Sequence, residues 1–146
     1  MSLDSLRRVH AQATESLMME LSQLTQMLTR TEAQIRTMET QMQADADAYA
    51  QQARQGLTIE EMLEWQGKMD AQQAAVQEVR ASIDRTTALW QQTKERLIEA
   101  RQECKLLERV AERRQMAVRE AMARREQSVT DEAAHRQVSV RGHRDS

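Results

Sequence analysis

The sequence predicts an all-α protein: a long two-stranded antiparallel coiled-coil hairpin whose second helix overhangs at its C-terminus. Three observations predict this fold. The chain contains no Pro and no Phe, and it is rich in residues with high helix propensity, such as Ala, Leu, Met, Gln, Glu and Arg. Apolar residues recur at alternating steps of three and four in two long stretches, which is typical of helices that pack along a narrow stripe. One strong break separates the two stretches.

The first helix is expected at about 3–50. Ser2 is a candidate N-cap, because its hydroxyl can accept a hydrogen bond from the first helical turn. The helix then carries an apolar stripe with steps of four and three. The stripe consists of Leu17, Leu21, Leu24, Leu28, Thr31, Ile35, Met38, Met42, Asp45 and Tyr49.

The break is expected as a turn at about 51–57. Gly56 is the best candidate for the left-handed residue that ends a helix. Thr58 and Glu61, three residues apart, form a capping box that starts the next helix. Because a helix end is followed directly by a helix start, the two helices are predicted to be antiparallel neighbours.

The second helix is expected at about 58–134, so that residues 1–134 form a single hairpin and residues 135–146 a disordered tail. Its stripe has two columns in a seven-residue repeat. The first column is Met62, Met69, Val76, Ile83, Trp90, Leu97, Cys104, Ala111 and Val118. The second column is Trp65, Gln72, Val79, Thr86, Thr93, Ala100, Leu107, Arg114 and Ala121.

The two stripes can be aligned as an antiparallel pair around the expected turn. In that register Leu17 faces Trp90, Leu24 faces Ile83, Leu28 faces Val79, Met38 faces Met69 and Met42 faces Trp65. Registers shifted by a heptad remain possible. The N-terminal end of the first helix lies opposite Cys104 or Lys105 in this register. The rest of the second helix is therefore expected to have no partner in the chain.

The residues predict no enzyme, no cofactor and no metal site. The three His residues and the single Cys lie far apart in sequence, and there is no Gly-rich phosphate-binding loop. The net charge of −2 argues against a nucleic-acid partner. The single Cys fits a reducing compartment, and no apolar run is long enough for a membrane span. We therefore expect a cytoplasmic protein without a small-molecule substrate.

Two features exceed the needs of a plain hairpin. One is a group of large side chains near the turn, which either fill the core or form an adaptable docking surface. This group is Met38, Met42, Tyr49, Met62, Trp65 and Met69. The other is the overhang, which is either a solvated helix or inserted into a partner. A structural coiled coil that homodimerises through Leu107, Ala111 and Val118 is the alternative.

Several local patterns are shared with one protein family. They are the leading LxxL pattern from Leu3, the break near Gly56, the stretch LWQQTKERL at 89–97, and the pattern RREQ followed by DEA at 124–133. With these patterns, nearly the whole chain resembles the flagellar export protein FliJ and its YscO-type relatives in type III secretion.

The resemblance implies a central stalk that inserts into a hexameric export ATPase and promotes its assembly and activity. It also implies contacts with the cytoplasmic ring of the export gate and with export chaperones, at the inner-membrane export apparatus. A stalk of virulence-type secretion is an alternative. The residues expected to bind the ATPase are Leu107, Arg114, Val118, Arg124, Arg125, Glu126, Gln127, Asp131 and Glu132. The large side chains near the turn are expected to bind the gate or the chaperones.

Overall fold

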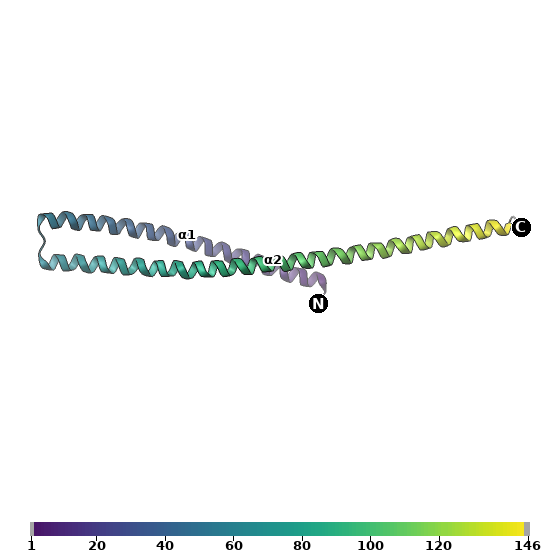
Figure 1. Cartoon of the computed structure of the whole chain (residues 1–146), viewed down its shortest axis with the longest axis horizontal. Helices are drawn as coiled ribbons and strands as arrows, with labels where there is room; N and C mark the ends of the chain where they lie inside the picture. The colour runs from purple at the N-terminus through teal and green to yellow at the C-terminus, as the bar shows by residue number, and fades with distance from the viewer. Residues whose placement is uncertain (1, 145–146) are drawn as a thin grey trace. The chain divides into compact units, whose positions relative to one another are not determined.

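The structure, a computed structural model, describes residues 2–144. It consists of two helices, α1 (Leu3–Gln55) and α2 (Ile59–Arg144), joined by the short connection of residues 56–58 (Figure 1). The described residues contain no strand. Two long helices that pack against each other confirm the predicted all-α hairpin class.

The helix ends form as the sequence predicts. Gly56 has a φ of 101°, a left-handed conformation that costs a glycine little, and its N–H donates to the Ala53 carbonyl at 3.3 Å. The Thr58 hydroxyl accepts from the Glu61 N–H at 3.2 Å, and the Ser2 hydroxyl accepts from the Ser5 N–H at 3.2 Å. Side-chain caps therefore satisfy backbone donors at the start of both helices.

The helices are longer than predicted. α1 continues past residue 50 to Gln55, because the segment before Gly56 contains only Ala, Gln and Arg, which favour a helix even without a seam. The turn is therefore confined to residues 56–58 instead of 51–57. α2 continues past residue 134 to Arg144, so the expected disordered tail is helical up to that residue, and residues 145–146 lie outside the described part. Nothing between 135 and 141 breaks a helix, since this segment contains neither Pro nor Gly.

The chain divides into two compact units, where a single hairpin was expected. The hairpin unit, Gln12–Ala100, contains the turn and most of the seam. The terminal unit combines the residues up to Ala11 with those from Arg101 onward. Each unit is described separately below.

In the hairpin unit the helices touch along the predicted stripes. On α2, both predicted columns are half-buried or buried from Trp65 to Ala100. On α1, the stripe from Leu17 to Tyr49 is half-buried or buried as well. Only four side chains among the described residues are buried, namely Val76, Leu97, Thr93 and Asp45. The core is thus a single thin layer between two helices.

The helices pair one heptad away from the predicted register, so the predicted pairs are wrong. Tyr49, not Met42, packs against Trp65, with ring centroids 5.8 Å apart. The indole N–H of Trp90 donates to the Thr25 hydroxyl at 3.0 Å, whereas Leu17 was the predicted neighbour.

An ion pair between the helices fits this register better than the predicted one: Arg80 Nη2 lies 2.8 Å from Glu39 Oε1. The shorter turn accounts for the shift, because each residue added to α1 moves the hairpin's centre toward Leu57.

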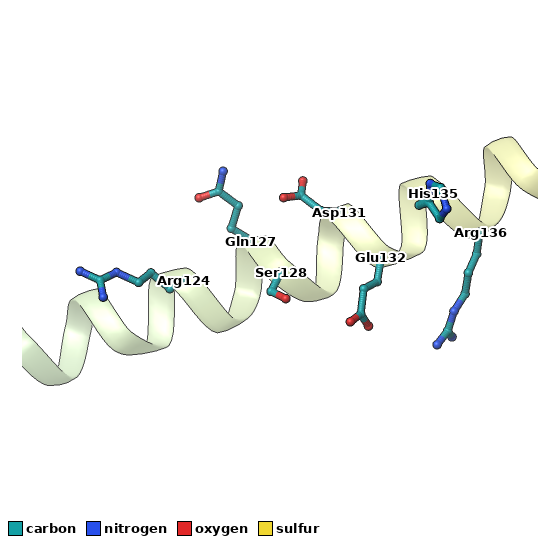
Figure 2. A pocket seen from close by; sticks show the side chains of 7 residues that line it. All are labelled: Arg124, Gln127, Ser128, Asp131, Glu132, His135 and Arg136. Atoms are coloured by element: carbon teal, nitrogen blue, oxygen red, sulfur yellow. The ribbon is translucent and has the colours of Figure 1, made fainter.

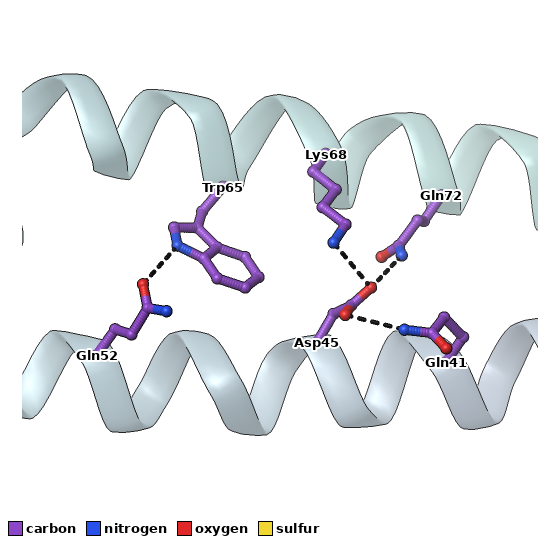
Figure 3. Close-up of polar contacts among 6 residues, drawn as sticks. All are labelled: Gln41, Asp45, Gln52, Trp65, Lys68 and Gln72. Carbon is purple, nitrogen blue, oxygen red and sulfur yellow. Dashed lines mark hydrogen bonds and ion pairs between the residues drawn. The ribbon is translucent and has the colours of Figure 1, made fainter.

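A polar cluster around Asp45 gives the register a physical cause (Figure 3). Asp45 is 8% exposed and accepts hydrogen bonds from Gln72 on α2 and, at 3.1 Å, from Gln41 on its own helix. Lys68 Nζ lies 3.5 Å from its carboxylate. In the predicted register Asp45 would face Met62 and leave a seam carboxylate without these partners. Apolar matching alone therefore selected the wrong heptad.

The same contacts lower the pKa of the Asp45 carboxyl below its usual value of 3.8. The hydrogen bond from Gln72 is the main cause, and it outweighs burial, which raises the pKa. The Gln41 hydrogen bond and the positive charge of Lys68 lower it further. The ionised form of Asp45 is therefore the one that the folded hairpin stabilises.

In the terminal unit, the start of α1 lies against α2. His10 Nδ1 lies 3.3 Å from Glu103 Oε2, and Leu3, Leu6 and His10 are half-buried. On α2, the half-buried positions are Cys104, Leu107 and Ala111, which continue the predicted columns. All side chains from 112 to 142 are exposed, so the seam ends at Ala111 rather than running on to Ala121.

The observed register predicts which cysteine pairs can form disulfides in a Cys104→Ser background. Thr31→Cys with Ile83→Cys should cross-link under mild oxidation, because the two positions face each other across the seam. Leu24→Cys with the same Ile83→Cys should not, since Leu24 lies about 10 Å further along α1. Non-reducing electrophoresis of both variants distinguishes the two registers, and efficient cross-linking through Leu24→Cys alone would refute the one described.

The lowered pKa of Asp45 predicts how its contribution to stability depends on pH. Because the folded-state pKa lies below 3.8, the stabilisation is fully present above that pH and is lost as pH falls through the folded-state pKa. We expect Asp45→Asn to unfold at a lower temperature than the parent at pH 7, with the difference shrinking below pH 4. Thermal unfolding followed by circular dichroism measures it, and Asp47→Asn on the exposed face is the control. A difference independent of pH down to pH 2 would contradict the assignment.

Candidate functional site

The strongest candidate site is the overhang, defined as residues 112–144 of α2. Every side chain from 112 to 142 is exposed, although a helix of this length normally buries one face. Large apolar residues are among them: Val118 is 58% exposed and Val129 is 66% exposed. A helix that presents apolar side chains over several turns indicates a surface for a partner.

The residues of the tail pattern are distributed around this helix. Figure 2 shows Gln127 and Asp131 on one side, and Glu132 and Arg136 on another. Among the described side chains of the overhang, one ion pair joins Arg124 Nη2 to Glu120 Oε2 at 3.9 Å, between two exposed side chains. The side chains do not converge on one point, so they do not form a substrate pocket. They can instead contact a partner that surrounds the helix.

The predicted ATPase-binding residues all lie on α2, but they do not form one set. Leu107 is half-buried and belongs to the seam of the terminal unit. The other predicted residues are exposed on the overhang: Arg114, Val118, Arg124, Arg125, Glu126, Gln127, Asp131 and Glu132. Leu107 is thus less accessible to a partner than the residues that follow it.

The predicted docking residues near the turn are mostly part of the seam. Met38, Met42, Tyr49, Trp65 and Met69 are half-buried between the helices. The ring nitrogen of Trp65 donates to Gln52 at 3.1 Å, and Lys68 Nζ lies 5.3 Å from the centre of the Trp65 ring. These side chains fill the core, and only Met62, 45% exposed, faces outward.

Two outward-facing residues near the turn escaped the sequence prediction. Ile59 is 77% exposed and Leu63 is 62% exposed, and both flank Met62 in the first turns of α2. Their spacing of four places them on one face of the helix. The sequence contained a signal for this surface, because Ile59 and Leu63 are apolar residues outside both heptad columns. We name Ile59, Met62 and Leu63 the outer patch.

The described residues offer no sign of metal or membrane chemistry. Among residues 2–144, no three His, Cys, Asp or Glu side chains are grouped so that they could hold a metal ion. Neither helix contains, in its described part, an apolar segment long enough to cross a membrane.

Comparison with known proteins agrees with this arrangement. Residues 1–143 match the family model described as "Flagellar FliJ protein", which covers both helices and the turn. No similar curated protein and no similar solved structure was found. The chain therefore belongs to the FliJ family and is a structural component of flagellar protein export.

Proposed function

We propose that this protein is the central stalk of the flagellar export ATPase. The overhang inserts into the central hole of the hexameric ATPase and promotes its assembly and activity. The hairpin links the ATPase to the cytoplasmic ring of the export gate and to export chaperones. The protein itself acts without enzymatic chemistry, in the cytoplasm, and reaches the inner membrane only through these partners.

One observation carries the proposal: the described side chains of the overhang are exposed on all sides of a continuous helix. A helix that packs on a flat partner needs only one contact face. A helix that is enclosed by a ring needs suitable groups all around it, and Figure 2 shows charged and amide side chains on two sides of this part of the helix. Arg is well suited to such contacts because its planar fork pairs with carboxylates.

The outer patch supports a second binding surface near the turn. Three apolar side chains are exposed there on the first turns of α2, and burying them against a partner would be favourable. We propose that the gate ring or a chaperone binds Ile59, Met62 and Leu63. The seam residues of the earlier prediction hold this surface in place instead of contacting the partner.

The stalk role predicts the effect of removing the overhang. A chain truncated after Ala111 keeps the hairpin unit and the half-buried residues of the terminal unit, so it should fold. It should fail to stimulate the purified cognate ATPase. Steady-state phosphate release with and without the protein measures this effect.

A chain truncated after Ala134 is the matched control. It retains all the predicted ATPase-binding residues, and we expect it to stimulate the ATPase. Undiminished stimulation by the chain truncated after Ala111 would refute the insertion proposal.

The outer patch predicts a separate loss of binding. The double variant Ile59→Lys and Leu63→Lys should bind the cytoplasmic domain of the gate, or a chaperone, at least about tenfold more weakly, since each buried Leu or Ile is worth about 1.5–3 kcal/mol. Leu89→Lys is the control, because Leu89 is also exposed on α2 but lies far from the turn. Titration calorimetry compares the three proteins. Equal affinities for both partners would remove the outer patch from the proposal.

A further inference from the structure

The exposed part of α2 carries an internal repeat of eleven residues. Blocks 107–117, 118–128 and 129–139 read LERVAERRQMA, VREAMARREQS and VTDEAAHRQVS. In each block the first residue is aliphatic, the fifth is Ala or Met, the eighth is Arg and the ninth is Gln or Glu. The repeat begins at Leu107, about one helical turn before the last half-buried position, Ala111. The repeat thus takes over where the partner helix ends.

An eleven-residue repeat places equivalent residues almost on one line along the helix. Eleven residues make three turns of about 3.67 residues each, close to the 3.6 of an α-helix. The first and fifth positions then form one apolar stripe that advances about 16.5 Å per repeat. The stripe is Leu107, Ala111, Val118, Met122, Val129, Ala133 and Val140. From Val118 onward all its members are exposed.

One edge of this stripe is basic. The eighth position lies beside the first after two turns, so Arg114, Arg125 and Arg136 follow one edge. None of the three forms an ion pair with another described residue, in contrast to Arg124, which pairs with Glu120. The ninth position follows the opposite edge and carries Gln115, Glu126 and Gln137. The stripe is therefore asymmetric in charge.

This asymmetry disfavours a second copy of the chain as the partner. In an antiparallel pair with two-fold symmetry, each edge faces the same edge of the other copy, so three Arg would face three Arg. In a parallel pair the basic edge would meet the ninth positions, which offer one carboxylate, Glu126. Neither arrangement pairs the three guanidinium groups, although an acidic partner would pair all of them.

We propose that the overhang is a docking stripe for an acidic amphipathic helix of another protein. The partner's apolar face covers the stripe, and its carboxylates pair with Arg114, Arg125 and Arg136. The three repeats provide equivalent binding positions about 16.5 Å apart. A partner helix displaced by one repeat would therefore contact the same types of residue. If the partner is the ATPase, the acidic helix is the surface that the ATPase presents to the overhang. In this respect the inference rests on the proposed function.

Two peptides test whether the stripe prefers an acidic helix, which we call the charge rule, without requiring the natural partner. The swapped peptide contains residues 107–140 with Arg114→Glu, Arg125→Glu and Arg136→Glu, and the matched control is the unchanged peptide. The swapped peptide should bind the full chain roughly tenfold more tightly at low salt, since three exposed ion pairs contribute about 0.5 kcal/mol each. The advantage should diminish as salt screens these pairs. Fluorescence anisotropy of labelled peptides measures both affinities.

Equal affinities would overturn the charge rule, and tighter binding of the unchanged peptide would favour a second copy as the occupant. Absence of binding by the swapped peptide would overturn the docking stripe itself.

Two deletions in the full chain test the repeat. Deletion of residues 118–128 removes one complete repeat and keeps the remaining stripe in line. Deletion of residues 119–127 removes nine residues and rotates the distal stripe by about half a turn, at 100° per residue. The first variant should retain binding of the swapped peptide, and the second should lose most of it. Circular dichroism checks that the hairpin melts alike in both variants.

The outcomes separate this inference from the stalk role. If both deletion variants bind the swapped peptide alike while the parent chain stimulates the ATPase, the repeat has no role and the stalk proposal stands. If the parent chain fails to stimulate the ATPase, the stalk proposal fails. The peptide measurements still decide whether the stripe binds an acidic helix.

Discussion

The register of the hairpin depends on the hydrogen bonds and the ion pair made by the carboxylate of Asp45, which lies in an otherwise mostly apolar seam. This carboxylate accepts hydrogen bonds from Gln72 and Gln41 and forms an ion pair with Lys68. Two of these three side chains come from the opposite helix. A slip of one heptad in either direction would set Asp45 against Met62 or Val76 instead. Desolvating a carboxylate without a partner is costly, whereas apolar seam residues tolerate such a slip. A polar residue in the seam therefore specifies the register of the two helices, which the apolar residues alone do not.

The register in turn decides which side chains near the turn are available to a partner. With Tyr49 packed on Trp65, the large residues of the seam are occupied by each other. The outer patch then lies at the start of α2, where Ile59 and Leu63 are 77% and 62% exposed. The half-buried seam and the proposed binding surface thus lie on different faces of the same helix turns.

At the other end of α2, the change of repeat coincides with the loss of the partner helix. A heptad stripe drifts around a straight helix and suits two helices that supercoil around each other. The eleven-residue repeat drifts more slowly around the helix and in the opposite direction, so a partner can follow it with only a slight right-handed supercoil. Since the change occurs near Ala111, where burial ends, the sequence of α2 distinguishes a segment that pairs within the chain from one that remains exposed.

The sequence by itself determined the helical class, the glycine and threonine that end one helix and start the next, and the columns that line the seam between Trp65 and Ala111. These features are local, because capping and helical periodicity are set by residues a few positions apart. The role of tail residues such as Arg124 and Asp131 stays a prediction from the resemblance to the family.

Only the tertiary structure decided the register, the outward position of Ile59 and Leu63, and the point where the seam stops. A heptad pattern looks the same after a shift of seven residues, so apolar spacing cannot choose between registers. That choice depends on contacts between distant residues, such as Asp45 with Gln72, which exist only when the two helices lie side by side.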